Sequence, residues 1–315
     1  IIGFWQQISQ VPTPAGWLSN AQMNWIKVRS YSVFGNPNIF ALYLLGILSI
    51  ISDLLIESYR YPKTAICFWR KQSSSDFFLY PMKKSRFSGY GRWIYSASLI
   101  LIFLAVLIAL YFTYSRGAWF LGIIFLGLRF GPYFGQRRWM ILGITFLFLG
   151  TLRGFQIRMG PLLSLTDSSL WYRVRIWQGV FRAIFDHLLW GSGPGSFPWI
   201  YPWYQIGTVA SLHAHQLYLQ IWLENGFFSL IAFFGLFRKM IVSSWPIFGC
   251  KGVPAQKGYF ATTILQTSIS LAAIILLYLG YGLAETWTQN QLIGGYFWFF
   301  CGLWISSQGK EIARA

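Results

Sequence analysis

Apolar residues gather in seven runs along the chain, and the segments between them carry most of its charge. A helix that crosses the hydrocarbon core of a bilayer needs about 20 apolar residues, with about 17 as a lower limit. The third and fourth runs are the shortest, and the sequence defines the ends of these two helices least sharply. The pattern predicts an all-α integral membrane protein, a polytopic bundle with about seven transmembrane helices, at roughly 39–56, 94–113, 116–129, 139–151, 215–237, 261–281 and 291–306.

The charge of the connecting segments predicts how this bundle is oriented. Strict alternation of seven spans places 17 of the 25 Lys and Arg residues on one side and 8 on the other. Basic residues accumulate in cytoplasmic loops, so the side with 17 is expected to be cytoplasmic. The predicted organisation is an outer segment 1–38, four helices in 39–151 with a basic cytoplasmic loop at 57–93, a large outer loop 152–214, and three helices with a short cytoplasmic tail in 215–315.

Composition supports a membrane protein. The chain is 55% hydrophobic and only 10% charged, whereas a soluble domain carries about 25% charged residues. The net charge of +17 is explained by basic residues that flank membrane spans, so we expect no nucleic-acid partner. The three cysteines lie far apart, without metal-ligand or redox spacing, and we expect no disulfide.

The loop 152–214 is too long for a simple connector. Within it, residues 168–188 have the periodicity of an amphipathic helix. Its expected apolar face consists of Trp171, Val174, Trp177, Phe181, Ile184 and Leu188. We expect this helix to lie on the membrane surface or over the bundle, with Arg173 aimed inward and Arg175 outward.

His215 stands at the expected outer end of the fifth span, in the segment Ser211-Leu-His-Ala-His-Gln216. A neutral imidazole can accept a proton from a hydroxyl near neutral pH, and a helix N-terminus disfavours the charged imidazolium. His215 is therefore a candidate general base, and His213 competes for the role. The alternative is an interfacial histidine that hydrogen-bonds a loop carbonyl.

Arg116 lies in an expected tight outer turn, Thr113-Tyr-Ser-Arg-Gly-Ala-Trp119. An arginine so close to hydrocarbon needs an anionic partner or a water-filled cavity. Three acidic residues are expected on the same side: Asp167, Asp186 and Glu285. The excess of arginine there predicts an anionic ligand such as a phosphate, and snorkelling to lipid headgroups is the alternative.

The segment Gly191-Ser-Gly-Pro-Gly195 lacks the Gly-Lys-Ser/Thr ending of a P-loop. We expect it to be a turn after the amphipathic helix. Asp-x-Asp pairs, Cys/His clusters and His-Glu-x-x-His are missing from the sequence, which therefore predicts neither a bound divalent metal nor a cofactor.

In their order along roughly residues 30–235, these motifs resemble the O-antigen ligase and polymerase superfamily of bacterial membrane glycosyltransferases. The family signature is His, then Asn, Ser or Gln, nine residues, Gly, two residues, and Gly, Thr or Tyr. Here it reads His215-Gln216, Gly226 and Ser229, and the last position departs to another small residue. Other similar features are Gly35-Asn36-Pro37-Asn38, Ser115-Arg-Gly-Ala-Trp119, Arg173 with Trp177, and Gly191–Gly195.

The resemblance implies that glycan is transferred from an undecaprenyl-pyrophosphate carrier to an acceptor hydroxyl, on the periplasmic side of the inner (plasma) membrane. Arg116 and Arg173 would bind the pyrophosphate, and His215 would deprotonate the acceptor, with inversion and without metal. The secondary candidates are His213, Arg175 and Gln216. The implied partners are the lipid-linked glycan donor, a glycan, lipid or protein acceptor, and the lipid bilayer.

Two other functions stay open at this stage. A cyanobacterial branch with the same Gly-Asn-Pro-Asn and Gly-Pro-Gly features is described as transporting inorganic carbon, and it carries Tyr in the region of His215. A transporter needs polar or charged residues at mid-span, together with broken helices. Glu224, inside the fifth expected span, is the main candidate for such a residue. A non-catalytic membrane subunit is the third possibility, and it fits a span count below that of most family members.

Overall fold

The computed structural model describes residues 1–14, 25–60, 89–135, 137–244 and 259–312, and all regular structure in these ranges is helical. Cys67, Cys250 and most of the basic loop expected at 57–93 lie outside the described residues. Cys301 is buried in the last helix.

Each of the seven apolar runs overlaps one long helix. These helices are α3 (Pro37–Arg60), α4 (Gly89–Phe112), α5 (Arg116–Phe134), α6 (Arg137–Thr151), α10 (Leu217–Ser244), α11 (Tyr259–Tyr281) and α12 (Gln291–Ile312). By length and hydropathy, three segments of the described chain can cross a membrane: Pro37–Ile56, Trp93–Phe112 and Leu217–Arg238. The chain is thus a helical membrane protein, and the count of seven spans stays a prediction.

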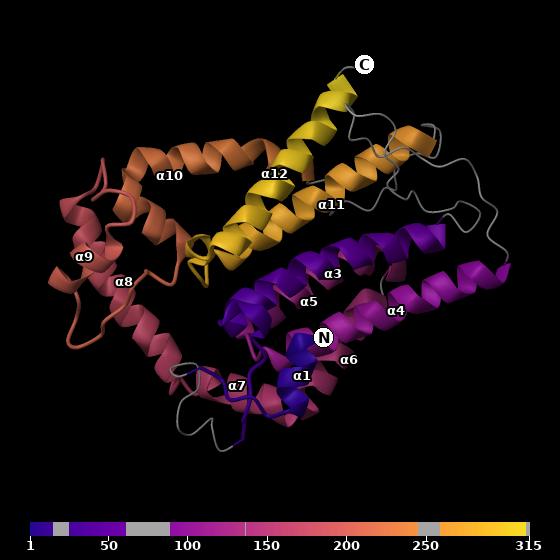
Figure 1. The fold of residues 1–315 in the computed structure, drawn as a ribbon, viewed down its shortest axis with the longest axis horizontal. Helices are drawn as coiled ribbons and strands as arrows, with labels where there is room; N and C mark the ends of the chain where they lie inside the picture. Colours follow the sequence, from indigo (N-terminus) through magenta and orange to yellow (C-terminus); the bar gives the residue numbers. More distant parts are fainter. Residues whose placement is uncertain (15–24, 61–88, 136, 245–258, 313–315) are drawn as a thin grey trace.

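Helices α3, α4, α11 and α12 run side by side as long rods, and α5 packs against α3 and α11 (Figure 1). Helix α3 is central, since 67% of its candidate span is buried against 22% of the span in α4. Helix α4 accordingly exposes large aliphatic side chains such as Ile100, Leu101 and Leu104. Such an exposed apolar face is expected of a helix whose neighbours are lipid tails.

The segment 152–214 is helical, as predicted, and forms a second packing unit. It contains α7 (Arg153–Leu163), α8 (Ser168–Asp186), α9 (Phe197–Ile200) and the 3₁₀ turn η2 (Tyr201–Trp203). Its own buried cluster joins α8, α9 and η2 to the first half of α10. In Figure 1, α8 and α9 lie to the left, away from the rods.

Helix α8 corresponds to the amphipathic helix expected at 168–188, but its buried face is rotated. Two residues of the expected face do pack inward, since Ile184 is buried and Trp177 contacts the same buried cluster. The other buried residues are Ile176, Val180 and Ala183, whereas the expected Trp171, Phe181 and Leu188 are exposed. The reason is the close approach of η2, which brings the Tyr204 carbonyl oxygen to 2.8 Å from where a Cβ of Gly179 would lie. Small residues let backbones approach closely, so they decided this face rather than the largest apolar side chains.

Helix α10 is kinked at Gly226, which has φ +83° and ψ 172°. The chain after α8 passes through this kink, where Ser192 N donates to Leu223 O at 2.8 Å and Phe227 N donates to Leu188 O at 3.1 Å. A side chain at Gly226 would collide with the Leu189 carbonyl. The glycine of the signature is therefore required by backbone geometry. It lets the first half of α10 pack on α8 and the second half pack on the rods.

Candidate functional site

Most of the polar residues of interest gather at the end of the bundle where α3, α5 and α10 begin and α4 and α11 end. Backbone hydrogen bonds tie the loops together there. Leu217 N donates to Gly282 O at 2.7 Å, and Ser30 N donates to Phe112 O at 2.9 Å. The short elements α1 (Ile2–Ile8), η1 (Ser32–Phe34) and η4 (Trp287–Gln289) complete this end of the described chain.

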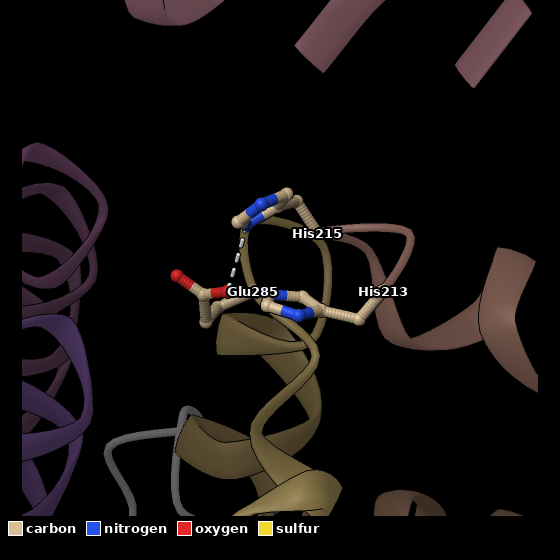
Figure 2. Close-up of side chains that lie close together, drawn as sticks. All are labelled: His213, His215 and Glu285. Atoms are coloured by element: carbon tan, nitrogen blue, oxygen red, sulfur yellow. Dashed lines mark hydrogen bonds and ion pairs between the residues drawn. The ribbon is translucent and has the colours of Figure 1, made fainter. Parts of the chain in front are cut away.

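Glu285 is the centre of the cluster and is only 2% exposed. Its Oε1 lies 3.1 Å from His215 Nδ1 and 3.5 Å from His213 Nε2. Its Oε2 accepts a hydrogen bond of 2.9 Å from Asn38 Nδ2 and lies 3.9 Å from Arg173 Nη2. Figure 2 shows the two imidazole rings beside the carboxylate. One carboxylate thus joins the first turn of α3, helix α8 and the loop before α10.

The charge states at this centre follow from burial and its compensation. Burial alone would raise the pKa of Glu285, but hydrogen bonds from His213 and His215 and the charge of Arg173 hold it well below its usual value. Burial lowers the pKa of His215, and this outweighs the opposite effect of Glu285. At neutral pH we therefore expect an ionised Glu285 beside a neutral His215. An ionised carboxylate can only accept, so Nδ1 of His215 carries the hydrogen and Nε2 keeps a free lone pair.

The backbone at His215 is also unusual, because its φ is +51°. A residue with a Cβ pays about 1–2 kcal/mol in this left-handed region. The conformation persists because Leu217 is bonded to Gly282 on one side and Ala214 N donates to Gln220 Oε1 at 2.7 Å on the other. Such strain is concentrated at functional sites.

Arg116 is the first residue of α5 and forms an ion pair with Asp167, one of the partners considered from the sequence. Its Nη1 also donates to the Arg158 carbonyl oxygen at 3.3 Å. Asp167 in turn caps α8, since Oδ1 accepts from Leu170 N at 2.9 Å. The pair therefore connects the turn before α5 to the start of the helix that carries Arg173.

Arg116, Arg173 and His215 belong to one electrostatic neighbourhood. Arg173 contacts Glu285, which contacts His215. Arg116 and Arg173 are both close enough to Arg158 to lower its pKa. Arg175 is exposed on α8, so the expected difference in direction between Arg173 and Arg175 agrees with the geometry.

The other secondary candidates lie close to His215. The His213 ring centroid is 4.0 Å from that of His215. The Gln216 side chain faces the helix instead, because its Oε1 accepts from Leu219 N. This bond supplies the first turn of α10 with a cap, which is a structural reason for a polar residue after His215.

His213, His215 and Glu285 offer three donor atoms that all lie within 4.8 Å of one another, and such a set could hold a divalent ion. The sequence showed no such cluster, because Glu285 stands 70 residues from His215. Two nearby positive charges oppose the binding of a cation at this cluster. Arg173 lies 3.9 Å from Glu285, and Arg29 is close enough to interact electrostatically with the same carboxylate. The prediction of no metal therefore stays a prediction.

The sequence indicates Asp167 and Glu285 only as possible partners of Arg116, and it assigns no role to Asn38, Arg29 or Arg158. Asn38 belongs to the Gly-Asn-Pro-Asn motif, which was a usable signal. Glu285 was noted only as one of the few acids expected on that side. Its contacts arise from tertiary packing of α11 and α12 beside α10, which no local pattern reveals.

In a comparison with known protein families, residues 100–234 match the family described as O-antigen ligase. No curated protein and no solved structure matches the chain. The matched range contains Arg116, Arg173 and the signature from His215 to Ser229, whereas Asn38 and Glu285 lie outside it. The match covers most of the motifs that carried the resemblance, so this part of the chain is similar to the O-antigen ligase family.

Proposed function

We propose that this chain transfers glycan from an undecaprenyl-pyrophosphate carrier to an acceptor hydroxyl. The observation that carries the proposal is the contact between the buried carboxylate of Glu285 and both His215 and Arg173. In this arrangement the imidazole of His215, oriented by Glu285, can act as the base. Arg173 supplies a cation for a phosphate, and a second arginine, Arg116, lies nearby. A base and a cationic leaving-group site are the two parts that metal-independent glycosyl transfer from a lipid pyrophosphate requires.

In the proposed reaction, Nε2 of His215 takes the proton of the acceptor hydroxyl. The hydroxyl oxygen forms a bond to the anomeric carbon as the bond from that carbon to the phosphate oxygen breaks. The electron pair of the broken bond goes to the phosphate, so the lipid pyrophosphate leaves with one more negative charge. Attack opposite the leaving group inverts the anomeric centre. Glu285 stabilises the imidazolium through Nδ1–H, and Arg116 and Arg173 stabilise the leaving pyrophosphate.

We further propose that the site faces the periplasm from the inner membrane, with segments 1–38 and 152–214 on that side and the loop 57–93 in the cytoplasm. The support is the distribution of 17 and 8 basic residues between the two sides of the predicted topology. Arg116, Arg173 and His215 all fall on the side with fewer basic residues. A glycan acceptor outside the cytoplasm, whether glycan, lipid or protein, would meet the site there.

The test is transfer by the purified chain in proteoliposomes, with an undecaprenyl-pyrophosphate-linked glycan as donor and release of undecaprenyl pyrophosphate as readout. We expect His215→Ala to lower the rate by about 100-fold or more, the usual contribution of a general base. His187→Ala is the matched control, because His187 is the remaining histidine and lies at the end of α8. Transfer by His215→Ala at the wild-type rate would contradict the mechanism.

A transporter is the second candidate, and one feature of the bundle favours it. Asp53, within the candidate span of α3, forms an ion pair with Arg129 of α5. Charged residues inside spans often mark ion pathways. Bicarbonate uptake by proteoliposomes that contain the wild-type chain would support this function, and loss of uptake in Asp53→Asn would assign it to the ion pair.

A further inference from the structure

Two more arginines lie at the same end of the bundle, although no sequence motif pointed to them. Arg29 precedes α3 and is 2% exposed, and Arg158 of α7 is 6% exposed. Arg29 Nε donates to Thr113 O at 2.8 Å, and Arg158 Nε donates to Tyr114 O at 3.1 Å. Two adjacent carbonyls of one turn, next to Arg116, thus hold both guanidinium groups.

The two residues have different neighbours within the cluster. Arg29 Nη2 donates to Asn38 Oδ1 at 3.0 Å, and Asn38 Nδ2 donates to Glu285. Arg29 therefore holds the amide that orients the carboxylate. Arg158 lies on the other side, where its own carbonyl oxygen accepts from Arg116. Arg158 is thus placed beside the first arginine expected to bind phosphate.

The described part of this cluster carries a surplus of positive charge. It contains four arginines, Arg29, Arg116, Arg158 and Arg173, and two carboxylates, Asp167 and Glu285. Burial, together with the smaller effect of the charges of the other three arginines, lowers the pKa of Arg158 to about 8. Concentrating positive charge in a largely buried site costs free energy, and a bound anion lowers that cost.

The surplus suits a particular phosphate chemistry. A sugar linked to a lipid through pyrophosphate is a diester with one ionised oxygen on each phosphorus, and therefore carries two negative charges. A sugar linked through a single phosphate carries only one. Cleavage of the sugar–oxygen bond adds a further charge to the terminal phosphate. A third guanidinium beside Arg116, with its planar fork of donors, is suited to that growing charge.

We propose that Arg158 is a third phosphate-binding residue, and that with Arg116 and Arg173 it makes the site select a diphosphate over a monophosphate. Arg29 is a positioning residue that acts through Asn38 on Glu285. The identity of the natural ligand, a lipid-linked diphosphate, rests on the proposed function. The test below measures only the binding of phosphate probes and does not depend on that function.

The experiment is calorimetric titration of the full chain in detergent with inorganic pyrophosphate and with inorganic phosphate. We expect the wild type to bind pyrophosphate at least about tenfold more tightly than phosphate. Arg158→Gln should remove that preference, whereas Arg182→Gln should keep it. Arg182 is the matched control, because it is exposed on α8 and its loss removes the same charge. Equal binding of the two probes by the wild type, or an unchanged preference in Arg158→Gln, would overturn the proposal.

Arg158→Lys keeps the experiment decisive if the glutamine variant fails to fold. Lysine keeps the charge but loses the fork, so we expect a preference for pyrophosphate that is several-fold smaller than in the wild type. An undiminished preference would count against Arg158. Selective binding without any glycan transfer would sink the proposed function alone, and transfer that depends on His215 but not on Arg158 would sink only this inference.

Discussion

Replacement of Glu285 by glutamine tests the centre of the cluster most directly. The substitution keeps the shape of the side chain and an oxygen that can accept from Asn38. It removes the charge that faces His215 at 3.1 Å and Arg173 at 3.9 Å. Because Glu285 is 2% exposed, water cannot replace the lost charge. Arg173 would then keep its positive charge beside a neutral group.

The size of the effect follows from the burial of the pair. Removal of one partner from a buried ion pair costs about 3–5 kcal/mol, because the other partner stays uncompensated. The retained acceptor for Asn38 places Glu285→Gln at the low end, at about 3 kcal/mol. For a chain of this size we expect the unfolding temperature to fall by about 2 °C per kcal/mol, hence by about 6 °C.

The dependence of this loss on pH is a second signature. The pKa of Glu285 is held well below its usual value in the folded chain, and in the unfolded chain it is about 4.3. A depressed folded pKa stabilises the chain at every pH above the unfolded value. That stabilisation is lost as the pH falls through the folded value. The difference between wild type and variant should therefore be constant from pH 6 to 8 and shrink only below about pH 4.

The assay is thermal unfolding of the purified chain in detergent, read by intrinsic tryptophan fluorescence. Asp186→Asn is the control, because the exposed carboxylate of Asp186 accepts only one described side-chain hydrogen bond, from the Tyr204 hydroxyl at 2.6 Å. We expect that variant to unfold within about 1 °C of the wild type. An equally stable Glu285→Gln variant at pH 7 would refute the assignment of Glu285 as the charge that holds this end of the bundle together.

Three further predictions concern other parts of the chain. Gly226→Ala should unfold at a much lower temperature than Gly235→Ala, since a Cβ at 226 meets the Leu189 carbonyl while the space around Gly235 is open; thermal unfolding of both variants decides. Gln216→Ala should lose the bond that caps α10 and cost about 1 kcal/mol, and Gln216→Asn should recover part of that stability in the same measurement. Treatment with EDTA should leave glycan transfer unchanged, and a loss restored by zinc would show that a metal is required.

The long helices could be predicted because a backbone in lipid must satisfy its hydrogen bonds internally. Runs such as 39–56 therefore had only one regular structure available. Hydrophobicity was less informative on α8, where Trp171 and Phe181 are exposed and Gly179 and Ala183 are buried. In a segment that carries aromatic residues on several sides, backbone approach decides which face packs, and periodicity does not encode that approach.

The contacts of the site could be predicted only in part, for a reason of distance along the chain. His215 and Arg173 each stood out by the chemistry of a single side chain. Their meeting at Glu285 depends on residues 38, 173 and 285 being brought to one point by α3, α8 and the loop before α12. The ends of these helices can be predicted from the sequence, but the way in which the helices pack against one another cannot. Besides the motif that contains Asn38, the scarcity of acidic residues was an available signal, since each acid among so many cations must serve several partners.

The kink of α10 explains how the chain builds this site at the end of a bundle. His215 must lie beside Glu285, which follows α11, while Arg173 arrives on α8 from a separate packing unit. A straight α10 could pack along either the long helices of the bundle or the unit around α8, but not along both. With Gly226 left-handed, its first half lies against α8 and its second half against the rods. The signature spacing from His215 to Gly226 therefore fixes the position of the base relative to the helix that carries the arginine. A single insertion between them would turn His215 by about 100° around the helix axis, away from Glu285.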